Sequence, residues 1–268
     1  MSATKISKKF NTYKKLDSII SASKLKVLHN MSKVKLAAVH NYEVALLAKH
    51  TFEVAYKKYK FQSEIYDNDF KTGKNMNVLF LEEKMTLSHS SERIINAYLK
   101  NKNRNDLNIV VADFKFDKSI FGENATFLTS KELPSVSHEI IYRYVTKQYE
   151  RVNVYSSLNE ENKYSTILPM KELEEKEGKK TNVINSKTKF IPSIEKAIEL
   201  SFVDYLNGLF RYFFINSKYE ELKKTLLKHE TSIDHVSDEL EKLKKQMNKI
   251  RQEKLTNEIL LGFRGQDD

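Results

Sequence analysis

The segment from Tyr219 to Leu261 constrains the fold most, because its apolar residues recur at alternating steps of three and four. Such spacing is typical of a coiled-coil seam. The ten positions are Tyr219, Leu222, Leu226, His229, Ile233, Val236, Leu240, Leu243, Met247 and Ile250, and all except His229 are apolar or aromatic. So narrow a stripe cannot stabilise a solvated helix alone. The pattern therefore predicts a partner helix, in a coiled coil or in a helical bundle.

The beginning of the chain supplies a matching partner. No glycine or proline interrupts residues 4–61. The same alternation runs through Ile6, Phe10, Tyr13, Ile20, Val27, Met31, Val34, Ala38, Ala45, Phe52, Ala55 and Tyr59, with Asp17, Lys24 and Asn41 as polar interruptions. At 1.5 Å per residue such a helix reaches about 85 Å, which is longer than a globular domain of this size is wide. We expect the two ends of the chain to pair as antiparallel helices.

The middle of the chain alternates between strand and helix patterns. Strands are predicted at Met76–Leu81, Leu107–Ala112, Ala125–Leu128, Arg151–Tyr155 and Tyr164–Leu168, and helices at Ser88–Lys100 and Ser137–Tyr149. This order implies a small, largely parallel sheet with right-handed connections. The predicted fold class is α/β: a long antiparallel coiled coil of the N- and C-terminal helices, with a small Rossmann-like α/β domain inserted between them.

These patterns divide the chain into five parts. The N-terminal coiled-coil helix takes residues 1–72 and the α/β domain 73–170. A charged linker containing Gly178 takes 171–192, the C-terminal helix 193–262 and a tail 263–268. The last helix opens with an aromatic band from Phe202 to Phe214, too wide for a two-helix seam. We expect this band to pack against the sheet as core rather than to form a ligand site.

The formal net charge of +10 comes entirely from the first sixty residues, where thirteen lysines face Asp17, Glu43 and Glu53. A basic helix of this kind suits nucleic acid, a membrane surface or an acidic protein, or is simply a solvated face. The chain has no cysteine, so disulfides and cysteine-bound metals are excluded. No signal peptide is visible, and the most apolar stretch, Leu206–Ile215, is too short and too interrupted to span a bilayer.

Catalytic motifs are missing from the sequence. It contains no GxxxxGK[ST] phosphate loop, no GxGxxG after the first strand and no nucleophile elbow. Its seven histidines form no ligand-spaced set with carboxylates, so no metal site is predicted. Glu82 and Glu83 follow the first strand, but adjacent strand residues point to opposite faces and cannot form one acid–base pair. We expect no catalytic residue and no cofactor.

The residues from Asn248 to Ile259 follow a more specific pattern. It reads Asn, a basic residue, any residue, Arg-Gln, two variable positions, an aliphatic residue, Thr, a variable position, Glu and an aliphatic residue. The matching residues are Asn248, Lys249, Arg251, Gln252, Leu255, Thr256, Glu258 and Ile259. This segment resembles the C-terminal signature of the gamma subunit of rotary F-type ATP synthases. That family also places an α/β domain between two long helices, so the resemblance spans the whole chain.

The first helix is similar to that of the gamma family, though less closely. Ile19, Ala22, Leu25 and Met31 fall where the family has Ile, Ala, Met and Met, whereas Ser21 replaces a usual basic residue. The resemblance implies a rotor shaft, itself non-catalytic, inside a hexameric ring of alternating catalytic and non-catalytic P-loop ATPase subunits. It also implies an epsilon-like stalk subunit, a membrane rotor ring, and a peripheral place on the cytoplasmic side of the cell membrane.

Site residues follow from the same resemblance. Arg251 and Gln252 match positions that bind an acidic and polar loop of the catalytic subunit. Thr256 and Glu258 match positions that contact the same collar. The lysines of the first helix are assigned by charge alone to an acidic lever loop of the catalytic subunits: Lys8, Lys9, Lys24 and Lys26. Nucleic acid is not an expected partner.

Two departures from the family keep an alternative open. Glu83-Lys84-Met85-Thr86 replaces a Gly-Leu-Cys-Gly turn, and Gly262-Phe263-Arg264-Gly265 replaces a small-residue end. The alternative is a gamma-like subunit of a specialised ATPase that hydrolyses ATP for mechanical work such as gliding motility. The heavy use of Lys, Asn and Ile fits an AT-rich, mycoplasma-type genome. Further alternatives are a basic coiled-coil nucleic-acid binder, which lacks aromatic residues interleaved with base-reading groups, and an α/β enzyme.

Overall fold

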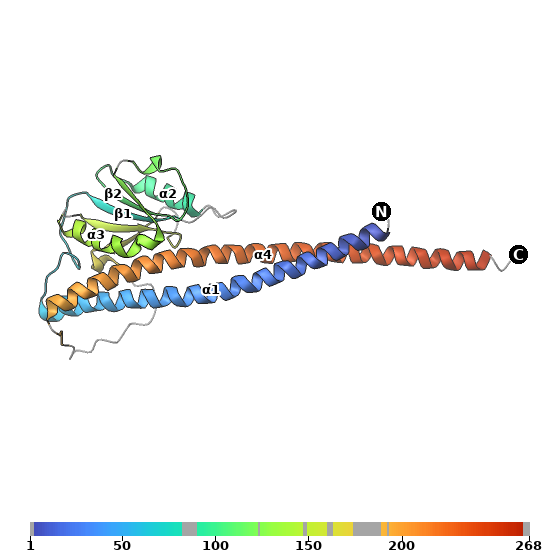
Figure 1. Ribbon diagram of the computed structural model, residues 1–268, viewed down its shortest axis with the longest axis horizontal. Helices are drawn as coiled ribbons and strands as arrows, with labels where there is room; N and C mark the ends of the chain where they lie inside the picture. Colours follow the sequence, from blue (N-terminus) through green and yellow to red (C-terminus); the bar gives the residue numbers. More distant parts are fainter. Residues whose placement is uncertain are drawn as a thin grey trace. The chain divides into compact units, whose positions relative to one another are not determined.

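The computed structural model describes residues 3–81, 90–122, 124–146, 149–159, 163–173, 189–191 and 193–264. Two long helices, α1 (Ala3–Tyr59) and α4 (Ile194–Arg264), flank a small α/β domain in the sequence, which confirms the predicted fold class (Figure 1). The chain divides into two compact units. We call residues 1–32 with 222–268 the coiled-coil unit, and residues 33–221 the sheet unit. None of the described helices is long and apolar enough for a membrane span.

The sheet has five strands in the order β3-β2-β1-β4-β5. They are β1 (Asn75–Phe80), β2 (Leu107–Val111), β3 (Ala125–Leu128), β4 (Arg151–Tyr155) and β5 (Ser165–Leu168). The first four run parallel and β5 is antiparallel to β4. Each observed strand lies within a residue of its prediction. The sheet is therefore largely parallel, as expected.

Two shorter helices and three 3-10 turns complete the sheet unit. They are α2 (Ser90–Asn101), α3 (Leu133–Thr146), η1 (Ser119–Phe121), η2 (Ser130–Glu132) and η3 (Met170–Glu172). The prediction for α3 was wrong by about one turn, because the observed helix begins at Leu133 rather than Ser137. A capping box between Thr129 and Glu132 begins the 3-10 turn η2, which leads directly into α3 before the predicted start. Most of the predicted linker, including Gly178 and residue 192, and the segment Glu82–Thr86 lie outside the described residues.

Alternate residues of the strands face two hydrophobic cores. Met76, Val78 and Phe80 of β1 belong to the core that α1, α3 and α4 cover. Leu79 of β1 belongs to the core under α2, with Tyr98. The aromatic band of α4 is buried in the first core, as predicted, and the Phe80 ring lies 6.2 Å from that of Phe210. The band thus fastens α4 to the sheet.

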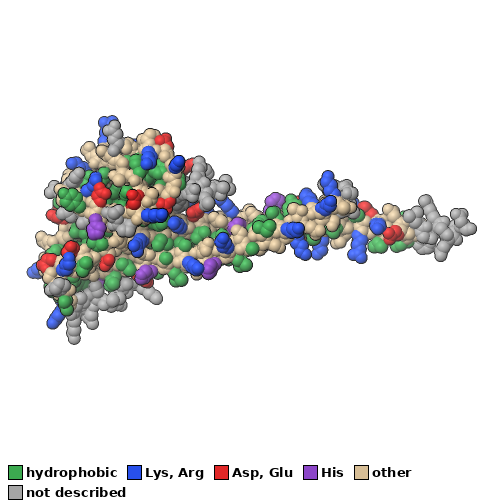
Figure 2. Space-filling model, in the orientation of Figure 1, with side chains coloured by type: hydrophobic (Ala, Val, Ile, Leu, Met, Phe, Trp, Pro, Cys, Tyr) green, Lys and Arg blue, Asp and Glu red, His purple; other side chains and the backbone are tan. Residues whose placement is uncertain are grey.

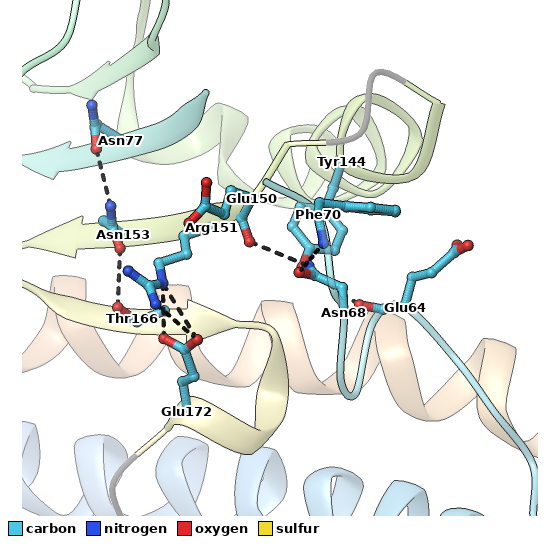
Figure 3. A network of polar contacts seen from close by, with 10 residues as sticks. All are labelled: Glu64, Asn68, Phe70, Asn77, Tyr144, Glu150, Arg151, Asn153, Thr166 and Glu172. Atoms are coloured by element: carbon cyan, nitrogen blue, oxygen red, sulfur yellow. Dashed lines mark hydrogen bonds and ion pairs between the residues drawn. The ribbon is translucent and has the colours of Figure 1, made fainter. Parts of the chain in front are cut away.

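A row of polar side chains crosses the sheet on the α2 side. Asn77 of β1 is in register with Asn108 of β2 and Asn153 of β4, and all three are buried. Asn77 Nδ2 donates to Asn108 Oδ1 at 3.2 Å and to Asp106 Oδ2 at 3.0 Å, while Thr166 of β5 donates to Asn153 Oδ1 at 3.0 Å (Figure 3). Because a slipped strand would leave these groups unpaired, the row favours one register.

Within the sheet unit, α1 and α4 approach each other through small residues. Ala45, Ala48 and Ala55 of α1 are buried in this contact. A Cβ atom built on Gly208 would lie 2.8 Å from the Asn41 carbonyl oxygen and 3.1 Å from Ala45 Cβ. No side chain larger than hydrogen fits there without movement. Tyr42 meets Tyr212 and Phe52 meets Phe202, so the two helices run antiparallel.

Within the coiled-coil unit, the predicted seam is the observed one. Val236 and Leu243 are buried and the other seam positions from Leu222 to Ile250 are half-buried. Residues between them, such as Lys244 and Lys245, are exposed. On α1 the buried positions are Ile6 and Val27, and the polar interruptions Asp17 and Lys24 are half-buried. The three-four periodicity therefore predicted which side chains meet.

Candidate partner-binding surface

The coiled-coil seam stops at Ile250, whereas α4 continues to Arg264. Ser23 Oγ lies 3.1 Å from His229 Nε2, and Lys24 Nζ lies 3.0 Å from Glu230 Oε1. Ala3, the first residue of α1, lies 20 residues before Ser23 and 21 before Lys24. Because the helices are antiparallel, the same number of residues after His229 and Glu230 places the level of Ala3 at positions 249 to 251 of α4. The last turns of α4 therefore extend beyond the start of α1 (Figure 1). Every residue from 251 to 260 is exposed.

The exposed end of α4 carries a new apolar face in place of the seam. The seam positions would continue at Lys254 and Asn257, which are polar. Leu255 and Ile259 lie instead on the side of the helix that Arg251 occupies, since residues three, four, seven and eight apart share a side. Their exposed fractions are 48% and 58%. Large apolar groups in this arrangement are typical of a surface that another chain covers.

Arg251 and Gln252 keep their full side-chain binding capacity. In the described part of the chain, neither side chain forms a hydrogen bond or an ion pair. A guanidinium can bind a carboxylate through two parallel bonds, and an amide can both donate and accept. These two neighbours therefore have the chemistry that binding an acidic and polar loop requires, and that role stays a prediction.

Thr256 and Glu258 are partly engaged by their own helix. Thr256 Oγ1 donates to the carbonyl oxygen of Gln252 at 3.0 Å. Glu258 Oε1 lies 3.7 Å from Lys254 Nζ. The structure thus brings all four predicted residues to one exposed segment, but leaves only Arg251 and Gln252 without an intramolecular partner.

The lysines predicted on α1 fall into two groups. Lys8, Lys9 and Lys26 are exposed, and Lys9 Nζ lies 5.7 Å from the centre of the Tyr13 ring. Lys24 is half-buried between the helices and paired with Glu230. Sequence reasoning missed this pairing, although the place of Lys24 in the seam was the signal, because a charge at a seam position needs a partner. Lys24 is therefore the least available of the four.

Acidic side chains of α4 are paired mainly with lysines of α4 itself. Glu239 Oε1 accepts a bond from Lys242 at 2.9 Å, which lowers the pKa of the Glu239 carboxyl and raises the pKa of Lys242. Glu241 is paired in the same way with Lys245, at 2.7 Å. These carboxylates of α4 are therefore neutralised by α4 itself rather than by the lysines of α1. Figure 2 shows lysine and arginine side chains recurring along this part of the molecule.

Comparison with known proteins shows which proteins the chain is similar to. No protein-family model matches it. The ATP synthase gamma chain of Mycoplasmopsis pulmonis (strain UAB CTIP) is 24% identical over 263 residues, which cover 91% of this chain and 92% of that protein. The chain is thus similar, at low identity, to an ATP synthase gamma chain along most of its length. The ATP synthase gamma chain of Clostridium novyi (strain NT) is 29% identical over 152 residues, 54% of this chain and 52% of that protein.

Two solved structures are similar to the chain at low sequence identity. The OSCP/F1/c-ring structure of Euglena gracilis mitochondrial ATP synthase matches with a TM-score of 0.44 and 13% identity, covering 96% of this chain and 91% of that chain. The rotor of the same enzyme matches at 0.44 and 12%, covering 94% and 98%. The relationship to gamma chains rests on sequence, and it extends over both long helices and the sheet.

In the α/β domain, the polar groups after strands β1 and β4 are the candidates for a ligand site. The carboxyl ends of β1 and β4, where such sheets place ligands, are followed by Glu82 and Glu83, outside the described residues, and by Ser156. Ser156 Oγ donates to Asn159 Oδ1 at 2.7 Å and Asn159 Nδ2 donates to Ser165 Oγ at 3.0 Å. In the part of the chain described, no three acidic or histidine side chains could hold a metal ion.

Proposed function

We propose that this chain is the rotor shaft, a gamma-like central-stalk subunit, of an F-type rotary ATPase. The observation that carries the proposal is the end of α4. There, Arg251 and Gln252 lie unpaired beside exposed Leu255 and Ile259, beyond the start of the partner helix. The similarity to an ATP synthase gamma chain over 91% of this chain supports it.

Torque transfer follows from the chemistry of that segment. Nucleotide turnover in a ring of alternating catalytic and non-catalytic subunits changes which subunit holds the shaft. Arg251 binds a carboxylate of a catalytic subunit, Gln252 binds a neighbouring polar group, and the aliphatic side chains fill an apolar collar. Thr256 and Glu258 contact the same collar once their intrahelical bonds exchange.

The basic face of α1 acts at longer range. Lys8, Lys9 and Lys26 meet acidic loops of the ring, and such contacts between exposed charges weaken as salt rises. Lys24 contributes less, because Glu230 already neutralises it. The chain itself binds no nucleotide. Its further partners are an epsilon-like stalk subunit and a membrane rotor ring, which place it on the cytoplasmic side of the cell membrane.

Purification of the tagged chain tests the assembly. Mass spectrometry should find P-loop ATPase subunits in several-fold excess over the shaft. Recovery of the chain alone, or with nucleic acid in place of ATPase subunits, would contradict the proposal.

Replacing Arg251 tests the contact. We expect Arg251→Ala to lower ATP hydrolysis by the purified complex roughly tenfold to hundredfold, because a hydrogen bond to a charged group contributes about 1.5–3 kcal/mol. Lys244→Ala is the matched control, since Lys244 is an exposed cation on the same helix between seam positions. Wild-type turnover in the Arg251 variant would count against the assignment, as would an equal loss in the control.

A second candidate is a complex that hydrolyses ATP for mechanical work, such as gliding motility. The departures at Glu83–Thr86 and Gly262–Gly265 from the family pattern favour it. Proton uptake by membrane vesicles separates the two candidates. If vesicles that contain the chain take up protons when ATP is added, a coupled rotary synthase is supported. If they hydrolyse ATP without proton uptake, the mechanical form is supported.

A further inference from the structure

We propose that β5 and η3 together form the junction that sets the orientation of the α/β domain on the helix pair. This junction segment runs from Ser165 to Leu173, and it contacts both long helices, the α1–β1 connection and the rest of the sheet. The contacts go chiefly to its main chain. The inference concerns the sheet unit alone and does not depend on the proposed function.

Helix α4 holds the junction segment from one side. The Tyr205 side chain is fully buried, and its hydroxyl donates to the carbonyl oxygen of Ile167 at 2.6 Å. Burial raises the pKa of Tyr205 well above its usual range, so the hydroxyl stays a donor. β5 has β4 on one side as its only strand neighbour in the described sheet. Backbone hydrogen bonds to β4 hold β5 along one edge. The bond from Tyr205 of α4 fixes the strand further.

Helix α1 holds the other end of the segment through a buried charge. Lys49 is 5% exposed, and its Nζ donates to the carbonyl oxygen of Leu173 at 2.8 Å. Taking an ammonium group out of water is costly, and apolar side chains at such positions often give equal or greater stability. A lysine here is therefore explained better by the orientation it imposes than by stability.

The α1–β1 connection and β4 complete the attachment. Met170 N donates to the carbonyl oxygen of Ile65 at 2.9 Å, and Lys171 N donates to that of Tyr66 at 3.0 Å. Arg151 of β4 lies 3.0 Å from Glu172 (Figure 3). Both long helices, the α1–β1 connection and β4 thus contact the same nine residues.

Directionality distinguishes these bonds from the surrounding core. Apolar packing between the sheet and the helices is favourable but non-directional, so it tolerates small rotations. Hydrogen bonds lose strength steeply when their angle changes. Two donors from different helices, aimed at Ile167 and Leu173, therefore leave one orientation preferred.

Pulsed electron paramagnetic resonance on the full chain tests this inference. The chain has no cysteine, so nitroxide labels attach only at introduced positions. Val39→Cys on α1 and Arg104→Cys after α2 are both exposed and both within the sheet unit. We expect one narrow distance distribution in this background, and one roughly twice as wide after Lys49→Met and Tyr205→Phe are added together.

The matched control pair is Lys57→Met with Tyr142→Phe, because both residues are exposed and carry the same two functional groups. The control should keep the narrow distribution. Each single variant is measured as well, so that a double variant that fails to fold still leaves a test. For Lys49→Met we expect a broader distribution with an unchanged or higher thermal midpoint.

Two results would overturn the inference. One is an unchanged distribution in folded Lys49→Met and Tyr205→Phe proteins. The other is a lower midpoint for Lys49→Met with an unchanged width, which would mean that the lysine only stabilises the fold.

Discussion

The two long helices are packed in different ways in the two units. In the sheet unit, Ala45, Ala48 and Gly208 bring the helix backbones close together, and the sheet covers α4. In the coiled-coil unit, larger seam residues alternate with polar pairs such as Ser23 with His229. The first arrangement buries a large continuous apolar core. The second leaves apolar and charged groups outside, which suits a surface that partners surround.

Core truncation should separate the two units most strongly. We expect Phe210→Ala to lower the free energy of unfolding by about 3–5 kcal/mol, since the buried ring packs on Phe80. Val236→Ala, at a buried seam position of the coiled-coil unit, should cost about 1–2 kcal/mol, because water and neighbouring side chains can close the gap. Urea unfolding followed by circular dichroism measures both. Equal losses would remove the distinction between the units.

Overpacking sharpens the same comparison. Gly208→Leu should cost about 1–3 kcal/mol, because even its Cβ would lie 2.8 Å from the Asn41 carbonyl oxygen. Ser237→Leu is the control on the exposed side of α4 in the coiled-coil unit, and should change stability by less than about 0.5 kcal/mol. A Gly208 variant as stable as the control would show that the helices can separate freely.

Alkaline pH should act more strongly on the sheet unit than on the coiled-coil unit. Burial raises the pKa of Tyr66 to about 12, and it also raises the pKa values of Tyr98, Tyr155 and Tyr205. A phenol held neutral in the folded state stabilises it fully below the unfolded pKa of about 10, and this contribution is lost as pH rises towards the folded pKa. All four residues lie in the sheet unit.

Circular dichroism checks the pH effect. On raising the pH from 9 to about 11.5, the near-ultraviolet tyrosine signal should be lost before the far-ultraviolet helical signal. Simultaneous loss of the two signals would contradict a difference between the units. Tyr142→Phe should leave the transition unchanged, because Tyr142 is 68% exposed.

Much of the fold was predictable because burial follows the period of the sequence. The three-four alternation predicted the seam residues from Leu222 to Ile250, and the apolar runs predicted the strands. Contacts between distant residues were not predictable in this way. The bonds of Asn77 with Asn108 and the closeness of Gly208 to Asn41 depend on register between elements, which no local pattern encodes.

The candidate site was predicted in part. The exposure of Arg251 and Gln252 agrees with the roles that the gamma-family motif assigned, while those roles stay a prediction. Lys24 was chosen by charge alone, and the structure pairs it with Glu230, next to the contact of Ser23 with His229. A charge count cannot distinguish a lysine that faces solvent from one that bridges two helices.

The glycine contact has a mechanical consequence. Where Gly208 meets Asn41 and Ala45, no layer of flexible side chains separates the two backbones. Close-packed protein interiors compress little and transmit strain. A sideways push on either helix at that level would therefore move its neighbour at once, with no rotamer rearrangement to absorb the displacement.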